Sequence, residues 1–375
     1  MDLVTYKLFL SGTQATRAQL DRVETIVVEQ AMDQLWQATV QVIITADENG
    51  RWTGPSEDFL QPLSRVRIEV EIGSNGFVPL IDGPVVGVDG ALDAQPGRSL
   101  ITLRVSDDGY YLLTQDDNTQ RSGDKDSDIA DDIFSGADHI SDTDIEETGA
   151  IAADRPTSVM QRYTKMETLQ LLAFRNGKHA FVLPGDSSDT SIGCFKEEDS
   201  DLDEDLPALV LLGHQRNIDT FSVTNNAQRP SNVQGSYIDI QTLDIRDATT
   251  ANYADLLGDD QSALGDGDPG VVQAPPGMLL AVDPDGALRG ECLRRSYAYD
   301  AQGTIQQRFY EGVLLPYKLI AVQGIDSLSG NYLIRSVKHT LTRSEYIQEF
   351  GLSRRGQSAS ADSSSSSAST RGAVA

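Results

Sequence analysis

The feature that most constrains the fold is a strict alternation of apolar and polar side chains in two early stretches of the chain. In the clearer stretch, arginines and glutamates alternate with Val66, Ile68, Val70 and Ile72. Residues 36–44 have the same period, with glutamines and a threonine between most of the apolar positions. Successive side chains of a strand point to opposite faces, so each stretch predicts a β-strand with one apolar face.

Turn signals separate these stretches from further apolar runs. Ser74-Asn75-Gly76 favours a turn, because Asn-Gly tolerates positive φ. Residues 81–88 and 100–105 are typical of strands that return across a sheet. Several short strands with turns between them predict a small antiparallel barrel or sandwich in residues 1–114.

The composition then changes, and residues 115–206 are predicted to form an acidic insertion followed by a middle domain with a helix and a strand. Acids dominate residues 115–154, which predicts a long mobile loop with a short helix at 128–134. Thr164-Lys165-Met166-Glu167 has the spacing of a capping box, and Gly177 stands where the helix that it opens would end. A strand is predicted at 179–183, before a second acidic run at 199–205.

Residues 207–356 are predicted to form a second β domain. Strands are predicted at 220–224, 236–241 and 317–322, with a Gly/Asp/Pro-rich excursion at about 251–300. The Ser-rich tail, 357–375, is predicted to be disordered because it has nothing to bury. The chain of 375 residues is long enough for two or three cores, and its class is mainly β with a small α/β part.

The charge of the chain argues against some partners. With 57 acidic and 30 basic residues the net charge is −27, which repels nucleic acid phosphates and anionic membrane surfaces. Two interpretations stay open: a soluble acidic surface, or an acidic channel wall to which cargo does not adhere.

The rest of the composition indicates assembly in a reducing compartment. Cys194 and Cys292 lie far apart and form no CxxC pair, so a disulfide framework is not expected. The N-terminus lacks the pattern of a secretion signal, and no run reaches the roughly 20 apolar residues of a membrane span.

The acidic runs have part of the pattern of a calcium-binding loop. An EF-hand loop needs oxygen ligands at positions 1, 3 and 5 and a glycine at position 6. The two candidate sets have the oxygens, but position 6 is Glu204 in one and Ile129 in the other. The candidate ligands are Asp199, Asp201 and Asp203 in the first set, and Asp124, Asp126 and Asp128 in the second.

No other pattern points to chemistry. Gly185-Asp186-Ser187-Ser188 resembles a serine hydrolase motif, but it follows Pro184 in a predicted turn. His179 and His339 have no second His or Cys at metal-ligand spacing, and the acids in residues 265–270 would repel phosphate. We therefore expect no catalytic, metal-binding or cofactor-binding residues and no enzymatic activity.

The last ordered stretch carries a resemblance to a known family. Residues 330–342 run from Gly330-Asn331-Tyr332 through a short apolar strand to Val337-Lys338-His339, and a final strand follows at 346–356. Together with the apolar lead at 310–324, this resembles the end of the hub domain of contractile injection machines. That family includes the late control D proteins of contractile-tailed phages and the N-terminal half of type VI spike proteins.

The resemblance implies two similar antiparallel β-barrels in each chain and a homotrimer, so that six barrels form a ring. The function implied is a structural baseplate hub that joins a hexameric inner tube to a trimeric spike. Partners would be an inner-tube protein, a spike on a separate polypeptide and other baseplate components, without nucleic acid or direct membrane insertion. The protein would assemble in the cytoplasm into a phage-tail-like particle, which is then extracellular or membrane-attached. The alternative is an acidic β-rich binding or adhesion module of a tail or cell surface.

Overall fold

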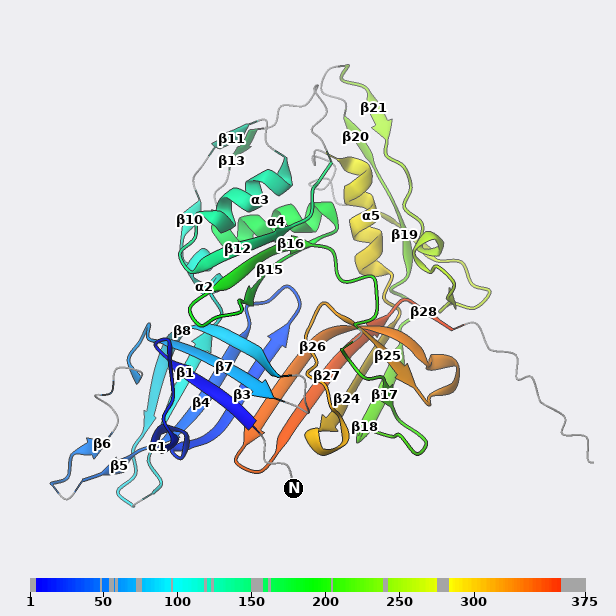
Figure 1. The fold of residues 1–375 in the computed structure, drawn as a ribbon. Helices are drawn as coiled ribbons and strands as arrows, with labels where there is room; N and C mark the ends of the chain where they lie inside the picture. Colours follow the sequence, from blue (N-terminus) through cyan, green and yellow to red (C-terminus); the bar gives the residue numbers. More distant parts are fainter. Residues whose placement is uncertain are drawn as a thin grey trace, which may run out of the picture.

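The computed structural model describes most of the chain (Figure 1). The described residues are 5–47, 49–53, 57, 60–71, 76–95, 97–117, 120–122, 125–149, 158–160, 163–203, 205–238, 242–274 and 283–358. The predicted Ser-rich tail therefore lies outside them, apart from its first two residues. In Figure 1 a curved sheet forms the lower part of the molecule, and the helices α3, α4 and α5 lie above it.

The core element is a 13-stranded sheet that combines strands from both halves of the chain. Its strands from the first half are β1 (Thr5–Leu10), β2 (Thr13–Gln14), β3 (Val23–Ala31), β4 (Gln37–Ile43), β7 (Arg65–Glu71), β8 (Phe77–Ala91) and β9 (Leu100–Ser106). Its strands from the second half are β17 (Leu209–Val210), β18 (Thr220–Asn225), β24 (Tyr299–Gln306), β25 (Leu319–Gln323), β26 (Gly330–Thr342) and β27 (Tyr346–Arg354). The mainly antiparallel β class predicted from the alternation is confirmed, and so is the closing hairpin, which is β26 and β27.

The two halves of this sheet repeat one strand order. In the first half the neighbours are β1, β7, β8, β9, β4 and β3. In the second half they are β17, β25, β26, β27, β24 and β18. Strands at matching places in the two halves of the sheet also come in the same order along the chain, so that β1 corresponds to β17, β3 to β18 and so on. Only the first pair differs in direction: β1 is antiparallel to β7, whereas β17 is parallel to β25. The chain therefore contains one six-stranded arrangement twice.

Two closed barrels are not found among the described strands, which corrects that part of the predicted fold. Strand β3 does not pair back onto β1 but pairs antiparallel with β26 of the second half. Since β26 occupies the hydrogen-bonding edge that closure would need, the two halves form one continuous sheet instead.

The acidic segment after β9 is more ordered than predicted. It contains α3 (Asp126–Ser135) and β12 (Ile140–Ile145), and β12 pairs in parallel with β16 (Ser191–Lys196). Ile129, Ile133 and Phe134 bury one face of α3 against α4 (Lys165–Asn176) and the strand β15 (His179–Pro184). A few apolar residues at helical spacing were enough to order a segment in which acids dominate.

The predicted capping box is confirmed in α4. The side chain of Thr164 accepts a hydrogen bond from the backbone N–H of Glu167, and the Glu167 carboxylate accepts one from the backbone N–H of Thr164. The helix ends at Gly177, whose φ of 71° is left-handed as the C-cap position requires.

The excursion predicted at about 251–300 contains a helix that the sequence analysis did not identify, α5 (Pro284–Arg295). Asp283 caps it, Pro284 opens it, and Glu291 pairs with Arg294 and Arg295. Two internal glycines obscured it in the sequence. The short strands nearby are β19 (Ser231–Gln234), β20 (Ser236–Ile238), β21 (Ile245–Asp247), β22 (Gln261–Ser262), β23 (Gly270–Gln273) and β28 (Gly356–Gln357).

The remaining strands and α-helices are small. They are β5 (Thr45–Ala46), β6 (Trp52–Thr53), β10 (Asp116–Asp117), β11 (Gln120–Ser122), β13 (Ser158–Met160), β14 (Tyr163–Thr164), α1 (Arg17–Leu20) and α2 (Gly109–Leu113). None of the helices in the described part of the chain combines the length and the hydropathy that a membrane crossing requires.

Candidate assembly surfaces

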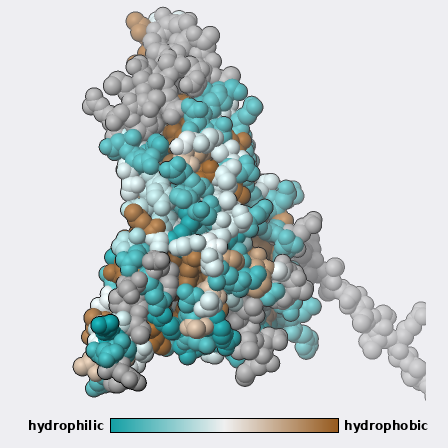
Figure 2. Space-filling model, turned by 60° about the vertical axis from the view of Figure 1, so that its left-hand side comes forward, coloured by the Kyte–Doolittle hydropathy of each residue, from teal (hydrophilic) through white to brown (hydrophobic). Residues whose placement is uncertain are grey.

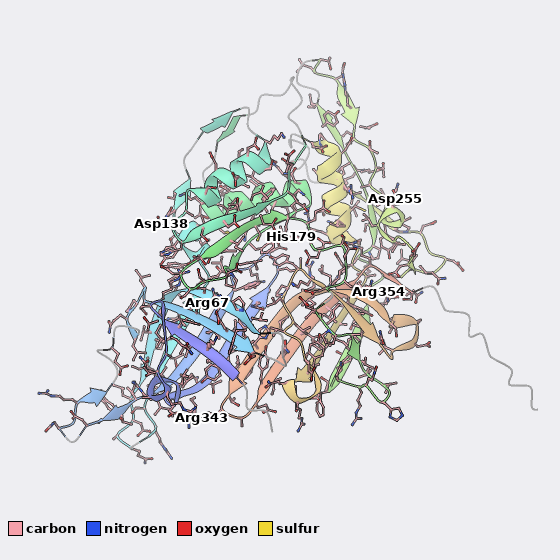
Figure 3. All side chains as sticks on the ribbon, viewed as in Figure 1. Arg67, Asp138, His179, Asp255, Arg343 and Arg354 are labelled. Atoms are coloured by element: carbon pink, nitrogen blue, oxygen red, sulfur yellow. The ribbon has the colours of Figure 1, made fainter. Side chains whose placement is uncertain are left out.

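The junction between the two halves of the sheet, which we call the seam, is formed by β3 and β26. Seven consecutive pairs hold it, from Ala31 opposite Ser336 to Thr25 opposite Thr342. At one end of the seam Arg343 donates from Nη2 to the carbonyl of Asp21, at 2.7 Å (Figure 3). The seam is thus a regular antiparallel ladder between residues some 300 positions apart in sequence.

A buried polar chain lies behind the seam. His339, which is fully buried, has Nδ1 2.7 Å from the Tyr346 hydroxyl and Nε2 3.0 Å from Oε1 of Gln30. The Gln30 amide donates to the carbonyl of Leu80 at 2.7 Å, so its oxygen faces the ring. Burial lowers the pKa of His339 to about 3, and the ring is therefore neutral at pH 7. Nε2 must then donate to Gln30, while Nδ1 accepts from Tyr346.

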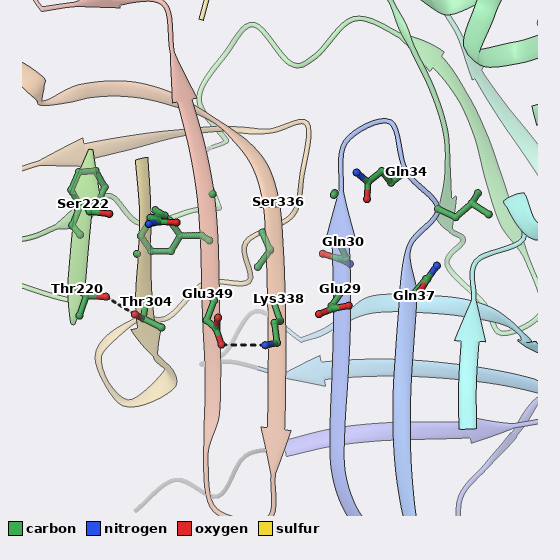
Figure 4. Close-up of a pocket in the computed structure, with 18 residues that line it drawn as sticks. Glu29, Gln30, Gln34, Gln37, Thr220, Ser222, Thr304, Ser336, Lys338 and Glu349 are labelled. Carbon is green, nitrogen blue, oxygen red and sulfur yellow. Dashed lines mark hydrogen bonds and ion pairs between the residues drawn. The ribbon is translucent and has the colours of Figure 1, made fainter. Parts of the chain in front are cut away.

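A groove of about 720 Å³ crosses the opposite face of the sheet at the seam (Figure 4). Its lining comes from β18, β24, β27, β26, β3 and β4 and consists mainly of threonine, serine, glutamine, glycine and a few apolar side chains. Its charged residues are Glu29, Lys338 and Glu349. Lys338 stands opposite both acids in register, and its Nζ is 3.6 Å from Oε1 of Glu349. On a chain of net charge −27, this groove is nearly neutral, so the interpretation of an acidic channel wall does not describe it.

His179, at the start of β15, joins the β15–β16 hairpin to the large sheet. Its Nδ1 lies 2.7 Å from Oδ1 of Asp33 in the β3–β4 turn, and its Nε2 lies 3.1 Å from Oε2 of Glu198. The other oxygen of Glu198 accepts hydrogen bonds from Tyr297 and Arg355, each at 2.6 Å. Figure 3 places His179 between the helices and the sheet. Four separate segments of the chain therefore meet at this one imidazole and its carboxylates.

The charges of this joint support one another. Burial opposes a charged ring, but the hydrogen bonds with Asp33 and Glu198 outweigh it and raise the pKa of His179 to about 9. Burial likewise opposes ionisation of Glu198, but the hydrogen bond with His179 and the charge of Arg355 lower its pKa to about 2. At neutral pH the joint thus contains an imidazolium between two carboxylates.

A second joint covers the polar side of β7. Arg67 donates from Nη1 to the carbonyls of Gly185 at 2.7 Å and Ser187 at 3.0 Å, in the turn between β15 and β16. Arg65 forms a bidentate pair with Asp108 at 2.8 and 2.6 Å. Both arginines, which alternate with the apolar residues of the strand, are buried under this turn.

The candidate motifs named in the sequence analysis lie in separate parts of the structure and form no common site. Gly185-Asp186-Ser187-Ser188 lies in the β15–β16 turn, as predicted, and His179 and His339 belong to different networks. Residues 265–270 form a turn that leads into β23. No group of three or more potential metal ligands occurs among the residues that the structure describes.

The acidic candidates also do not converge on a site. Asp199 and Asp201 are exposed, and Asp203 pairs with Lys318. Asp126 is buried against Arg175, 2.6 Å from its Nε, whereas Asp128 is exposed and Asp124 lies outside the described residues. The joints were not predicted, because their partners are separated by up to 157 residues and no local signal connects them.

No protein-family model matches the chain, and no curated protein matches it in sequence. Solved structures do match its fold. The 43 kDa tail protein of prophage MuSo2 from Shewanella oneidensis has a TM-score of 0.62 and 15% identity, and the match covers 94% of this chain and 98% of that one. A tail protein from Neisseria meningitidis MC58 has a TM-score of 0.58 and 12% identity, over 94% and 96% of the two chains.

A third match is to a component of the type VI secretion system of E. coli, which is described as similar to the phage T4 tail proteins gp27 and gp5. Its TM-score is 0.53 at 11% identity, over 92% of this chain and 76% of that one. The chain therefore has the fold of phage tail proteins and of this secretion-system component.

Proposed function

We propose that the protein is the structural hub of a contractile injection system or phage-like baseplate. Three copies would form a ring that joins a hexameric inner tube to a trimeric spike. The shared fold with phage tail proteins and with a type VI secretion component supports a tail or baseplate role.

The observation that carries this proposal is the repeated strand order. Each chain presents the same six-stranded arrangement twice, side by side. Three chains then present six similar units. The six units match the six subunits of the inner tube, and the three chains match the three subunits of the spike. A ring follows when a heterologous interface repeats with a rotation that closes.

The neutral groove supports the same role. A polar wall of low charge gives a passing or seated chain few strong electrostatic contacts, and net charge elsewhere keeps the particle soluble. We propose an inner-tube protein, a separate spike protein and other baseplate components as partners, without nucleic acid, in a particle assembled in the cytoplasm. We propose no catalytic role.

The experiment is the native mass of the purified chain by light scattering, with electron-microscopy class averages of the main peak. Three chains of 40.7 kDa give about 122 kDa, and the averages should have six lobes around a hole. A monomer or a stable dimer at micromolar concentration would contradict the hub and favour the acidic binding or adhesion module.

A further inference from the structure

We infer that strand β18 of one chain adds to the free edge of β8 in a second copy and continues the sheet from chain to chain. This inference rests on the proposed ring and specifies how its chains are joined. The first half of β8 pairs with β7, and the second half, from Val85, pairs with β9. The other edge of Val86–Ala91 has no strand partner among the described residues, and β18 pairs only with β24.

The internal repeat makes these two edges equivalent to the two sides of the seam. Strand β8 occupies the place of β26, and β18 occupies the place of β3. In the seam, β26 and β3 pair with each other. The same pairing therefore remains open once in each half of the chain: β8 lacks its β3-like neighbour, and β18 lacks its β26-like neighbour.

Two β-bulges define the equivalence residue by residue. Against β9, the pairing of β8 shifts between Val85 and Gly87, and against β27 the pairing of β26 shifts between Ile334 and Ser336. Aligning the bulges places Asp89 on Lys338. The equivalence of β3 and β18 follows from their neighbours β4 and β24, in which Gln37 corresponds to Asp300. Glu29 of β3 stands opposite Gln37, and Thr224 of β18 stands opposite Asp300, so Thr224 is the counterpart of Glu29.

The seam then supplies the register between chains. Lys338 stands opposite Glu29, so Asp89 should stand opposite Thr224 of the second copy. Three pairs further along, Leu341 stands opposite Ile26 within the seam, and its counterpart is Leu92 opposite Phe221. The same rule pairs Val88–Ala91 of β8 with Ser222–Asn225 of β18, in antiparallel order.

The exposure of the equivalent residues supports this register. Leu341 is 1% exposed in the seam, whereas Leu92, the first residue after β8, is 60% exposed. A second copy would cover Leu92 as the seam covers Leu341. Strand β18 (Thr220–Asn225) contains no charged side chain, so it can approach another chain of net charge −27 without local repulsion.

Disulfide cross-linking tests the register. In the seam, the N–H of Met32 donates to the carbonyl of Arg335, which makes Lys338 and Glu29 a non-hydrogen-bonded pair. Side chains are closest in such pairs, so Asp89→Cys with Thr224→Cys is the favoured cross-link. Within one chain these positions are separated by seven strand spacings, roughly 34 Å along the sheet, so the bond can form only between chains.

The expected result after copper-phenanthroline oxidation is a covalent ladder of up to three chains on a non-reducing denaturing gel, which collapses on reduction. The matched control, Asp89→Cys with Thr220→Cys, is out of register by roughly 13 Å and should stay uncross-linked. The unsubstituted chain reports the background, because Cys194 and Cys292 are buried.

A second variant tests the surface without cysteines. Leu92→Asp should weaken each interface by at least about tenfold and shift the mass from about 122 kDa toward 40.7 kDa. Leu243→Asp is the control, because Leu243 is 76% exposed on the distant β20–β21 hairpin, and it should leave the mass unchanged.

The outcomes separate this inference from the proposed function. A trimer that neither cross-links in register nor dissociates with Leu92→Asp keeps the hub but overturns the β8–β18 interface. An unsubstituted chain that stays monomeric overturns both.

Discussion

Two buried histidines show how single residues tie this molecule together in opposite charge states. His339 lies behind the seam among neutral partners, and burial keeps it neutral. His179 is almost as buried but lies between two carboxylates, which keep it charged. The difference arises from the partners and not from the depth of burial.

The charge of His179 predicts a loss of stability at alkaline pH. Its pKa of about 9 in the folded chain lies above the ordinary value of 6.5, so its contribution is complete below 6.5 and is lost as pH rises through 9. Between those values the free energy of unfolding should fall by about 1.4 kcal/mol per pH unit from this group. Urea unfolding from pH 6 to 10 measures the slope.

His179→Gln should flatten this slope, because the titrating group is gone. His214→Gln is the control: His214 is exposed, and the slope should persist. An identical slope in the His179 variant would show that another group controls the alkaline loss.

The helices α4 and α5 make a close backbone contact, and glycines allow it. A Cβ added at Gly290 would lie 2.5 Å from the Cα of Gly177, which is the left-handed cap of α4. The two backbones can therefore approach only if neither residue has a side chain there. This explains why α5 tolerates a glycine in its interior.

Gly290→Ala should destabilise the protein despite the higher helix propensity of alanine. The clash with backbone atoms outweighs the gain of about 1 kcal/mol from propensity, and we expect a net loss of about 1–3 kcal/mol. Arg289→Ala, at an exposed position of the same helix, should stay within about 0.5 kcal/mol. Thermal unfolding of both variants makes the comparison, and a stabilised Gly290→Ala would contradict the contact.

At the scale of the whole molecule, charge and surface are unevenly distributed. The face in Figure 2 is largely hydrophilic with scattered apolar side chains, and the chain carries a net charge of −27. The groove at the seam and strand β18 are nearly free of that charge. The groove proposed for passage and the β18 edge proposed for contact between chains therefore contribute little to the net charge.

This distribution predicts that assembly strengthens with salt. Long-range repulsion between three acidic chains is screened as the Debye length falls from about 30 Å at 0.01 M to about 8 Å at 0.15 M. The uncharged β18 edge has no ion pair for salt to weaken. Sedimentation at several protein concentrations should show the trimer dissociating at a lower concentration in 0.15 M salt than in 0.01 M. Dissociation promoted by salt would instead indicate an interface of ion pairs.

Much of the local structure was predictable. The closing hairpin, strands β4, β7 and β9, and the capped helix α4 follow from signals within a few residues, namely alternation, a capping box and a glycine at the helix end. The acidic insertion is more ordered than its sequence predicts, and α5 is not predicted at all. In both segments, acids and glycines conceal the few apolar residues that make the contacts.

Local sequence signals predict many of the strands and helices, because those choices depend largely on neighbours one to four positions away. The sequence by itself could not determine that β3 pairs with β26, that Gln30 meets His339, or that His179 lies between Asp33 and Glu198. An exposed strand edge offers the same backbone groups to any partner. The pairing of each half with the other, in place of closure on itself, is set by long-range packing that is visible only in the folded chain.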